Sequence, residues 1–296
     1  MAYKKFIGTG VALVTPFRKD DSIDFTALAK LVETLISGNI DYFVVLGTTG
    51  ETSTLTKDEK KAVASFVIEK VNKRKPIVLG VGGNNTAEIV DKLKKMDFEG
   101  IDAILSVSPY YNKPSQRGIS LHFNSVASVS PVPVIIYNVP GRTGSNITAE
   151  TTLRFAQEPG SNIIGIKEAS GNIVQIMEII RNKPESFLVI SGDDAFTLPI
   201  ISAGGSGVIS VVANAFPGIF SDMVRLALKD KFKEAREIHY KLLELIEYLF
   251  IEGSPSGIKA ALNILGYTQN QVRMPLVPVS RPVYNKIAEL IKALQS

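Results

Sequence analysis

The stretch Ile163-Ile-Gly-Ile-Lys-Glu168 begins with apolar or small residues and ends in two charged ones. A near-continuous apolar run of this kind is typical of a parallel strand that is buried on both faces. Similar runs rich in Val and Ile recur along the chain, at Gly10–Val14, Tyr42–Leu46, Ile77–Val81, Ala103–Ser106, Val134–Tyr137, Leu188–Ile190 and Gly207–Ser210. With Ile163–Ile166, they predict eight buried strands.

Helix signals separate the apolar runs. Thr56-Lys-Asp-Glu59 has the form of a capping box, in which the Thr and Glu side chains satisfy free amides at the start of a helix. Asn85 or Thr86 can cap the next helix. Eight strands that alternate with helices predict a (β/α)8 TIM barrel, complete by about residue 225. A doubly wound sheet is the alternative, but no G-x-G-x-x-G sequence follows the first run to support it.

The chain changes character at about Asp230. Beyond this point apolar residues recur at helical spacing in three segments, residues 235–249, 255–265 and 287–294. We therefore expect a catalytic barrel over residues 1–229 and a C-terminal helical domain over residues 230–296. Such an appendage is expected to cover a face of the barrel or to build an interface between subunits.

The composition of the 296 residues excludes several kinds of chemistry. The absence of Cys rules out thiol nucleophiles, disulfides and zinc–thiolate sites. There are only two His, His122 and His239, and neither follows a predicted strand. We therefore expect structural roles for both His, no metal site, and acid–base chemistry from Lys, Tyr, Asp or Glu. The net charge of +4 is spread along the chain, so it permits an anionic substrate without indicating a nucleic-acid partner.

The sequence does not indicate a membrane protein. The first residues lack the apolar core of a signal peptide. The longest uncharged stretch, Ala195–Ser221, is interrupted by Pro199, Gly204 and Pro217, so we interpret it as turns followed by a buried strand. A cytoplasmic protein without a membrane partner is therefore expected.

Lys167 is the most informative single residue, because the active site of a TIM barrel lies at the carboxyl ends of its strands. A charged ammonium inside a barrel is costly unless it is paired or neutral. Desolvation favours the neutral amine, which is the form that attacks a carbonyl carbon to give a Schiff base. The alternative is an ion pair at the barrel rim. Glu168 is a poor partner for it, because adjacent strand residues point to opposite faces.

Two other strand ends carry groups that suit a small carboxylic acid. Tyr137 ends the fifth run and either relays a proton or is an ordinary strand-end aromatic. Gly47-Thr-Thr-Gly-Glu51 offers amides and hydroxyls to a carboxylate, or it only caps its strand. Arg142 presents a planar guanidinium to a second carboxylate, or it is a solvated surface residue.

The motifs Gly47-Thr-Thr-Gly-Glu51, Tyr137-Asn-Val-Pro-Gly-Arg-Thr143 and Gly165-Ile-Lys-Glu-Ala-Ser170 resemble, in this order and spacing, those of the pyruvate-dependent class I aldolase superfamily. Within it the chain is most similar to the dihydrodipicolinate synthase (4-hydroxy-tetrahydrodipicolinate synthase) family. The resemblance implies an enzyme that condenses pyruvate with L-aspartate 4-semialdehyde to 4-hydroxy-tetrahydrodipicolinate, in lysine and diaminopimelate biosynthesis. It implies no cofactor and no metal, because a lysine–pyruvate Schiff base carries the chemistry.

The resemblance also implies catalytic roles. Lys167 forms the Schiff base with pyruvate, and Tyr137 relays protons during imine formation and cyclisation. Thr48 links Tyr137 to Tyr111 in a chain of hydroxyls, and Tyr111 reaches into the site of a neighbouring subunit. The family suggests a homotetramer built from two tight dimers, so we expect this homo-oligomer here.

Substrate binding follows from the same resemblance. Thr49 and the backbone at Ile209 bind pyruvate, and Arg142 binds the carboxylate of the semialdehyde. Arg142 favours the synthase over the alternative, a sialic acid lyase or 2-keto-3-deoxy sugar acid aldolase of the same superfamily, which usually lacks the Gly-Arg-Thr sequence. A third hypothesis is a barrel protein that binds a keto acid without turnover and serves as a regulator. The joint presence of Lys167, Tyr137, Thr48 and Arg142 argues against it.

An inhibitory lysine site of the family is matched only in part. Asn84, Glu88 and Tyr110 agree with it, whereas Lys57 and Lys60 stand where feedback-sensitive members often have His. Two cations repel a cationic ligand. We therefore expect weak or absent inhibition by L-lysine.

Overall fold

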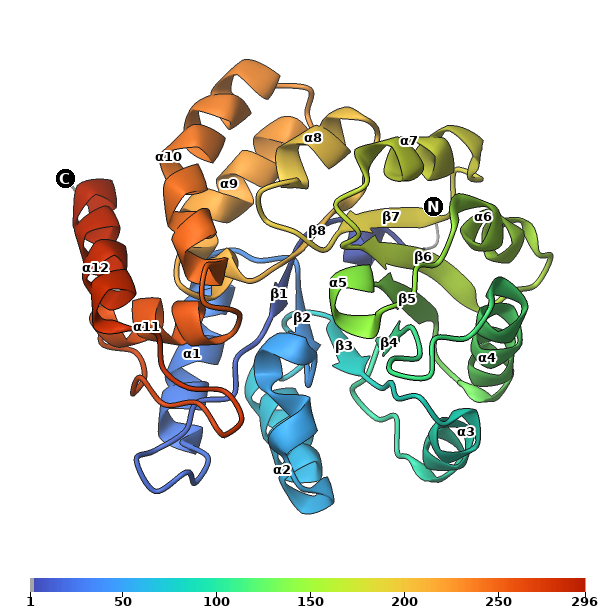
Figure 1. Cartoon of the computed structure of the whole chain (residues 1–296), viewed down its shortest axis with the longest axis horizontal. Coiled ribbons are helices and arrows are strands. Elements are labelled where there is room, and N and C mark those ends of the chain that lie inside the picture. The colour runs from blue at the N-terminus through green and yellow to red at the C-terminus, as the bar shows by residue number, and fades with distance from the viewer. Residues whose placement is uncertain (1–2, 296) are drawn as a thin grey trace.

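Eight parallel strands form a closed barrel in the computed structural model, which describes residues 3–295 (Figure 1). The strands pair in chain order, and β8 closes the barrel on β1. Their bounds are β1 Gly8–Ala12, β2 Tyr42–Val45, β3 Ile77–Gly80, β4 Ala103–Val107, β5 Val134–Asn138, β6 Ile163–Glu168, β7 Leu188–Ser191 and β8 Gly207–Ser210. Each overlaps a predicted run, so the TIM barrel is confirmed. The doubly wound alternative is wrong, because such a sheet is open at its edges.

Helices follow the strands and surround the barrel, as Figure 1 shows. Their bounds are α1 Phe25–Ser37, α2 Lys57–Val71, α3 Thr86–Lys95, α4 Gln116–Val129, α5 Pro140–Thr143, α6 Ala149–Gln157, α7 Ile173–Asn182, α8 Thr197–Ser202 and α9 Pro217–Ala227. The short 3-10 helices are η1 Lys4–Phe6, η2 Thr48–Gly50, η3 Thr52–Thr54 and η4 Val212–Asn214. The predicted capping box is present at Thr56 and Glu59, and the Asn85 side chain caps α3.

The strands separate two apolar cores, one inside the barrel and one under the helices. At the amino end, Phe6 of η1 meets Tyr42 edge to face, with ring centroids 5.7 Å apart. Gly10 makes room for this pair of rings, because an added Cβ would lie 2.3 Å from the Tyr42 ring. A filled amino end leaves the carboxyl end of the barrel as its mouth, where sites of this fold form.

A register shift in β6 decides which of its residues face the barrel interior. Val134 of β5 pairs with Ile163, but the next residue of β5 pairs with Gly165, so Ile164 is an extra residue in β6. An extra residue of this kind reverses the alternation of side chains beyond it. Strict alternation from Ile163, which packs on the outer core, would have turned Glu168 inward. The shift turns Lys167 inward instead.

The C-terminal appendage consists of α10 Phe232–Phe250, α11 Ser256–Ile264 and α12 Arg281–Gln295. All three predicted helical segments are therefore confirmed. Helix α10 packs against α8 and α9, and α11 contacts α12 and η4. Figure 1 shows the appendage on one side of the barrel.

The uncharged stretch Ala195–Ser221 contains β8, and also α8, η4 and the first turn of α9. It holds more helix than the predicted turns and strand, because short helices connect β7 to β8 and β8 to α9. Within residues 3–295, no helix is both long enough and apolar enough to cross a membrane.

Candidate active site

Lys167 and Tyr137 lie side by side at the carboxyl ends of β6 and β5. They are direct partners in the register of the two strands. Both residues are buried, and Lys167 Nζ lies 4.3 Å from the centroid of the Tyr137 ring. The structure thus brings together the amine and the phenol that the sequence placed on neighbouring strands.

The surroundings of Lys167 supply space rather than a counter-ion. Across residues 3–295, no carboxylate forms an ion pair with its ammonium group. Gly192 follows β7 beside it, and an added Cβ there would lie 3.0 Å from Lys167 Cε and 2.8 Å from Ala169 Cβ. A glycine at this position therefore leaves room for the lysine side chain. The ion pair considered as an alternative for Lys167 is not formed.

Glu168 points away from the barrel interior and holds β5 and β6 together from outside. Asn138, its register partner, donates from Nδ2 to both carboxylate oxygens at 3.0 and 3.2 Å. Gln175 Nε2 donates at 3.1 Å and the Ser170 N–H at 3.0 Å. Burial raises the pKa of Glu168, and these hydrogen bonds oppose that shift. This cross-link lies one residue beyond the Tyr137–Lys167 pair. The sequence signal for it was a glutamate at the end of a buried run.

The turn that follows β2 forms the 3-10 helix η2. The Glu51 N–H donates to Thr48 O at 3.0 Å and closes the turn. Thr15 Oγ1 donates to Gly50 O at 2.8 Å, which ties the turn to the segment after β1. Within the turn Thr49 is buried, whereas Thr48 is exposed.

Arg142 lies in α5, directly after β5. It is exposed, but its Nη2 donates to the carbonyl oxygen of Ser254 at 3.3 Å. Ser254 is buried and immediately precedes the Pro255 that leads into α11. The guanidinium therefore leans toward the appendage at the barrel mouth instead of extending freely into solvent.

Tyr110 and Tyr111 lie in the loop between β4 and α4. Tyr111 is 89% exposed, which makes it available to a neighbouring molecule. The loop is anchored at both sides: Asn84 Nδ2 donates to Tyr110 O at 3.1 Å, and the Ser108 N–H donates to Tyr137 O at 2.9 Å. The exposed ring is thus held at the rim of the barrel close to β5.

Ile209 is buried in the barrel interior, in the same apolar core as Tyr137. The backbone just beyond it is held by Asp194, whose Oδ2 accepts the Val211 and Val212 N–H groups at 3.0 and 2.9 Å. Burial raises the pKa of Asp194 to about 6. Sequence reasoning missed this support, although Asp194 stood in the segment that follows the seventh run.

The residues matched to the lysine site lie on α2, on α3, in the loop before α3 and, for Tyr110, in the loop between β4 and α4. Glu88 and Asn84 belong to the α3 side, and Lys57 and Lys60 to the first turn of α2. A further cation, Lys92 of α3, is close enough to Lys60 to be affected by its charge, because burial and the charge of Lys60 both lower the pKa of Lys92. The structure thus adds a third positive charge to the two that the sequence indicated.

Both His residues lie on helices, His122 on α4 and His239 on α10. His122 Nδ1 lies 2.8 Å from Thr86 Oγ1, between α4 and α3, and burial lowers the pKa of His122 to about 4. His239 is buried on α10. Among the described residues, no group of three or more His, Asp or Glu side chains is arranged to hold a metal ion.

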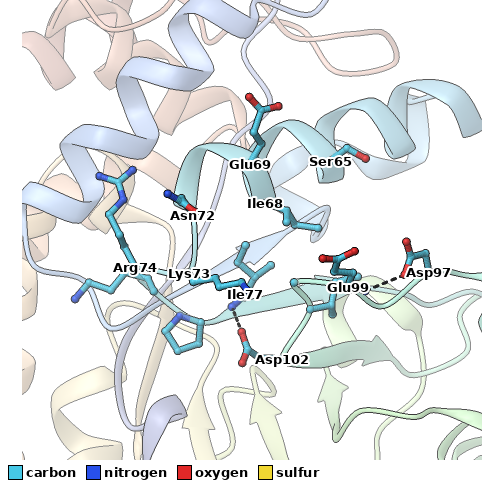
Figure 2. A pocket seen from close by; sticks show the side chains of 14 residues that line it. Ser65, Ile68, Glu69, Asn72, Lys73, Arg74, Ile77, Asp97, Glu99 and Asp102 are labelled. Atoms are coloured by element: carbon cyan, nitrogen blue, oxygen red, sulfur yellow. Dashed lines mark hydrogen bonds between the residues drawn. The ribbon is translucent and has the colours of Figure 1, made fainter.

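A groove of about 720 Å³ lies at the opposite end of the barrel, near the start of β3 (Figure 2). Two of its charged groups already have partners: Arg74 binds the Glu33 carboxylate through two nitrogens at 2.7 and 2.8 Å, and Asp102 accepts the Ile77 N–H at 2.8 Å and pairs with Lys5. Sites of this fold form at the other end. We therefore assign the chemistry to the barrel mouth and not to this groove.

The barrel mouth thus holds the Lys167 amine with the Tyr137 phenol beside it, and it also holds the Thr48–Thr49 turn and Arg142. This set of groups is typical of a barrel enzyme of the class I aldolase type, which forms a Schiff base with its substrate. Comparison with known proteins narrows this class. The model of the Dihydrodipicolinate synthetase family matches residues 5–294. The chain belongs to that family.

Individual relatives agree over nearly the whole chain. A protein of Parabacteroides distasonis named 4-hydroxy-tetrahydrodipicolinate synthase is 55% identical over 287 residues, which are 97% of this chain and 96% of the relative. The crystal structure of dihydrodipicolinate synthase from Aquifex aeolicus has a TM-score of 0.94 and 41% identity, and covers 98% of both chains. The enzyme from Cyanidioschyzon merolae, crystallised with lysine bound, has a TM-score of 0.94 and 37% identity, over 98% of this chain and 99% of the other. These comparisons support the synthase hypothesis over the sugar acid aldolase.

Proposed function

We propose that this enzyme condenses pyruvate with L-aspartate 4-semialdehyde to 4-hydroxy-tetrahydrodipicolinate, in the lysine and diaminopimelate pathway. The observation that carries the proposal is the buried pair at the barrel mouth, with Lys167 Nζ 4.3 Å from the Tyr137 ring. A buried amine without a carboxylate partner is suited to attack a ketone. The family and the names of its members supply the choice of substrates.

The chemistry starts with Lys167. Its amine adds to the ketone carbon of pyruvate, and loss of water gives a protonated imine. The imine withdraws electrons from the methyl carbon, so a methyl proton leaves and an enamine forms. Tyr137 is the group adjacent to Lys167 that gives and takes the protons of these steps. The protonated imine formed on Lys167 is the electron sink, so the sequence of steps requires no organic cofactor or metal.

The second substrate completes the reaction. The enamine carbon adds to the aldehyde of the semialdehyde, forming the carbon–carbon bond. The amino group of that substrate then attacks the imine carbon, which closes the ring and releases Lys167. Thr49 and the backbone at Ile209 hold the pyruvate carboxylate, and Arg142 holds the carboxylate of the semialdehyde. Orientation of two bound substrates supplies a large part of the rate in such a step.

The assignment of Thr48 and Tyr111 requires a second copy of the chain. We propose that Tyr111 enters the neighbouring subunit's site and continues a chain of hydroxyls through Thr48 to Tyr137. The 89% exposure of Tyr111 on an anchored loop supports this role. We place the enzyme in the cytoplasm as a homotetramer of two dimers, with residues 1–229 as the catalytic barrel. Analytical ultracentrifugation tests the assembly, and a monomer with full activity would overturn the role of Tyr111.

Borohydride reduction in the presence of pyruvate tests the reaction itself. We expect peptide mass mapping to show a reduced pyruvate adduct on Lys167. Turnover is then compared with L-aspartate 4-semialdehyde and with N-acetylmannosamine, and only the first is expected to react. Absence of label on Lys167 would refute the Schiff base, and a preference for N-acetylmannosamine would refute the substrate assignment.

A further inference from the structure

The segment at the start of helix α11 contacts Arg142 and the residue that closes the Thr48–Thr49 turn. Ser254, just before the helix, accepts a hydrogen bond from Arg142 at 3.3 Å. Lys259, the fourth residue of α11, forms an ion pair with Glu51, the residue that closes the Thr48–Thr49 turn. One short segment of the appendage, residues 254–259, therefore links Arg142 to the turn.

Glu51 is held by the appendage through both of its carboxylate oxygens. Its Oε1 pairs with Lys259, and its Oε2 accepts the Arg273 N–H at 3.0 Å. Glu51 has a φ of 54°, a left-handed conformation that is unfavourable for a residue with a side chain. It is also 2% exposed. A strained and buried glutamate that ends a substrate-binding turn is thus positioned by residues from the other end of the chain.

Lys259 is fixed as firmly as its partner. It is completely buried, its Nζ donates to Gln271 O at 2.9 Å, and the same nitrogen lies 4.0 Å from the centroid of the Phe17 ring. The Arg273 guanidinium lies over the same ring at 4.4 Å. A cation with three sets of contacts cannot shift without moving the helix that bears it.

Stability alone is a poor explanation for this pair. Burying two charges carries a desolvation cost that often cancels their attraction, and apolar replacements of similar volume are often neutral or stabilising. The pair does, however, fix the orientation of Glu51 relative to α11, because a carboxylate and an ammonium meet only in a narrow set of geometries. Because Glu51 closes the Thr48–Thr49 turn, a fixed orientation of Glu51 also fixes the turn.

We propose that α11 is a spacer that sets the distance between the two carboxylate-binding groups, with Glu51 and Lys259 as positioning residues. This inference rests on the proposed function, because it assumes that the turn binds pyruvate and Arg142 binds the semialdehyde. Through Glu51 the helix fixes the turn, and through Ser254 it fixes Arg142. Two substrates that must form a carbon–carbon bond require this separation to hold, since a displacement of ~1 Å costs roughly 100-fold in rate.

Three variants and one control test the spacer. Glu51→Gln keeps an acceptor for the Arg273 N–H but removes the charge, Lys259→Met removes the cation at similar volume, and Glu51→Asp keeps the charge on a shorter side chain and serves if the others fold poorly. We expect KM for pyruvate to rise about 10-fold or more in all three. KM for the semialdehyde is expected to rise as well, while borohydride still labels Lys167 at saturating pyruvate.

The control is Lys286→Met on α12, which removes the ion pairs of Lys286 with Glu244 and Glu289 and leaves the pair between Lys259 and Glu51 in place. Its KM values are expected to equal those of the original enzyme. All variants are assayed at a temperature where circular dichroism shows them folded, so a loss of stability does not enter KM. Unchanged KM values in folded Glu51→Gln and Lys259→Met would overturn the spacer. Failure of borohydride to label Lys167 in the unaltered enzyme would overturn the proposed function instead.

Discussion

Two lysines of this chain are buried in apolar elements, and one neighbouring group distinguishes them. Lys167 ends β6 at the barrel mouth, and no carboxylate among residues 3–295 pairs with it. Lys259 lies in α11 against Glu51, and burial lowers its pKa to about 8 while Glu51 opposes that shift. Both lysines are buried, so burial alone does not distinguish them. We attribute the nucleophilic role proposed for Lys167 to its access to the barrel mouth and to the absence of a counter-ion.

The largest expected effect is the difference in turnover and in borohydride labelling between Lys167→Met and Lys259→Met. Lys167→Met removes the amine to which we assign the imine, so turnover should fall by about 1000-fold or more and borohydride should no longer fix pyruvate. Lys259→Met should retain labelling of Lys167 at saturating pyruvate. Steady-state assays and peptide mapping measure both. A label that persists in Lys167→Met would assign the nucleophile elsewhere.

A substitution of Arg142 should affect the use of the semialdehyde and leave the binding of pyruvate intact. Arg142→Ala removes charged hydrogen bonds worth about 1.5–3 kcal/mol each, so kcat/KM for the semialdehyde should fall roughly 10- to 100-fold. Pyruvate labelling of Lys167 should remain, because the guanidinium is assigned to the other substrate. Arg154→Ala is the matched control, since Arg154 only forms an exposed pair with Glu150 on α6. Equal losses of pyruvate labelling and of semialdehyde turnover in Arg142→Ala would contradict the assignment.

The two lysines also show how far the sequence could be interpreted. The apolar runs predicted the barrel because strands buried on both faces leave a strong local pattern. Lys259 stands beside Ile258 in an apolar segment and carried the same signal as Lys167, but Glu51 is far away in sequence and only the fold reveals the pair.

The register of β6 was likewise hidden from the sequence. The inward position of Lys167 was inferred from its apolar strand, yet it depends on the extra residue Ile164, which only the pairing with β5 shows. The support given by Glu168 and Asp194 was missed because each depends on contacts between neighbouring strands and loops.

His122 extends the comparison to a buried base without a charged partner. Burial lowers its pKa to about 4 from the usual 6.5. Between these values the unfolded chain binds a proton that the folded chain does not, so the free energy of unfolding should fall as the pH drops from about 6.5 to 4. The full effect is about 3 kcal/mol. Urea unfolding at pH 7 and pH 4.5 measures it.

The matched variant is His122→Gln, which can still bond to Thr86 but does not titrate. Its stability should depend less steeply on pH over this range. A residual dependence is expected from His239, since burial lowers the pKa of that group as well. Identical pH profiles for the original protein and His122→Gln would show that folding does not lower the pKa of His122.

The smallest effect is expected from L-lysine. Glu88 is the one carboxylate among the residues matched to the lysine site, whereas Lys57, Lys60 and Lys92 bring positive charge to the same pair of helices. A cation ~8 Å from a second cation is destabilised by about 2 kcal/mol at an effective dielectric of 20, and less at high salt. Millimolar L-lysine in low-salt buffer should therefore leave turnover almost unchanged. A double variant, Lys57→His with Lys60→His, should be inhibited more strongly at pH 8, where the imidazoles are neutral. Strong inhibition of the original enzyme would mean that lysine binds away from these cations.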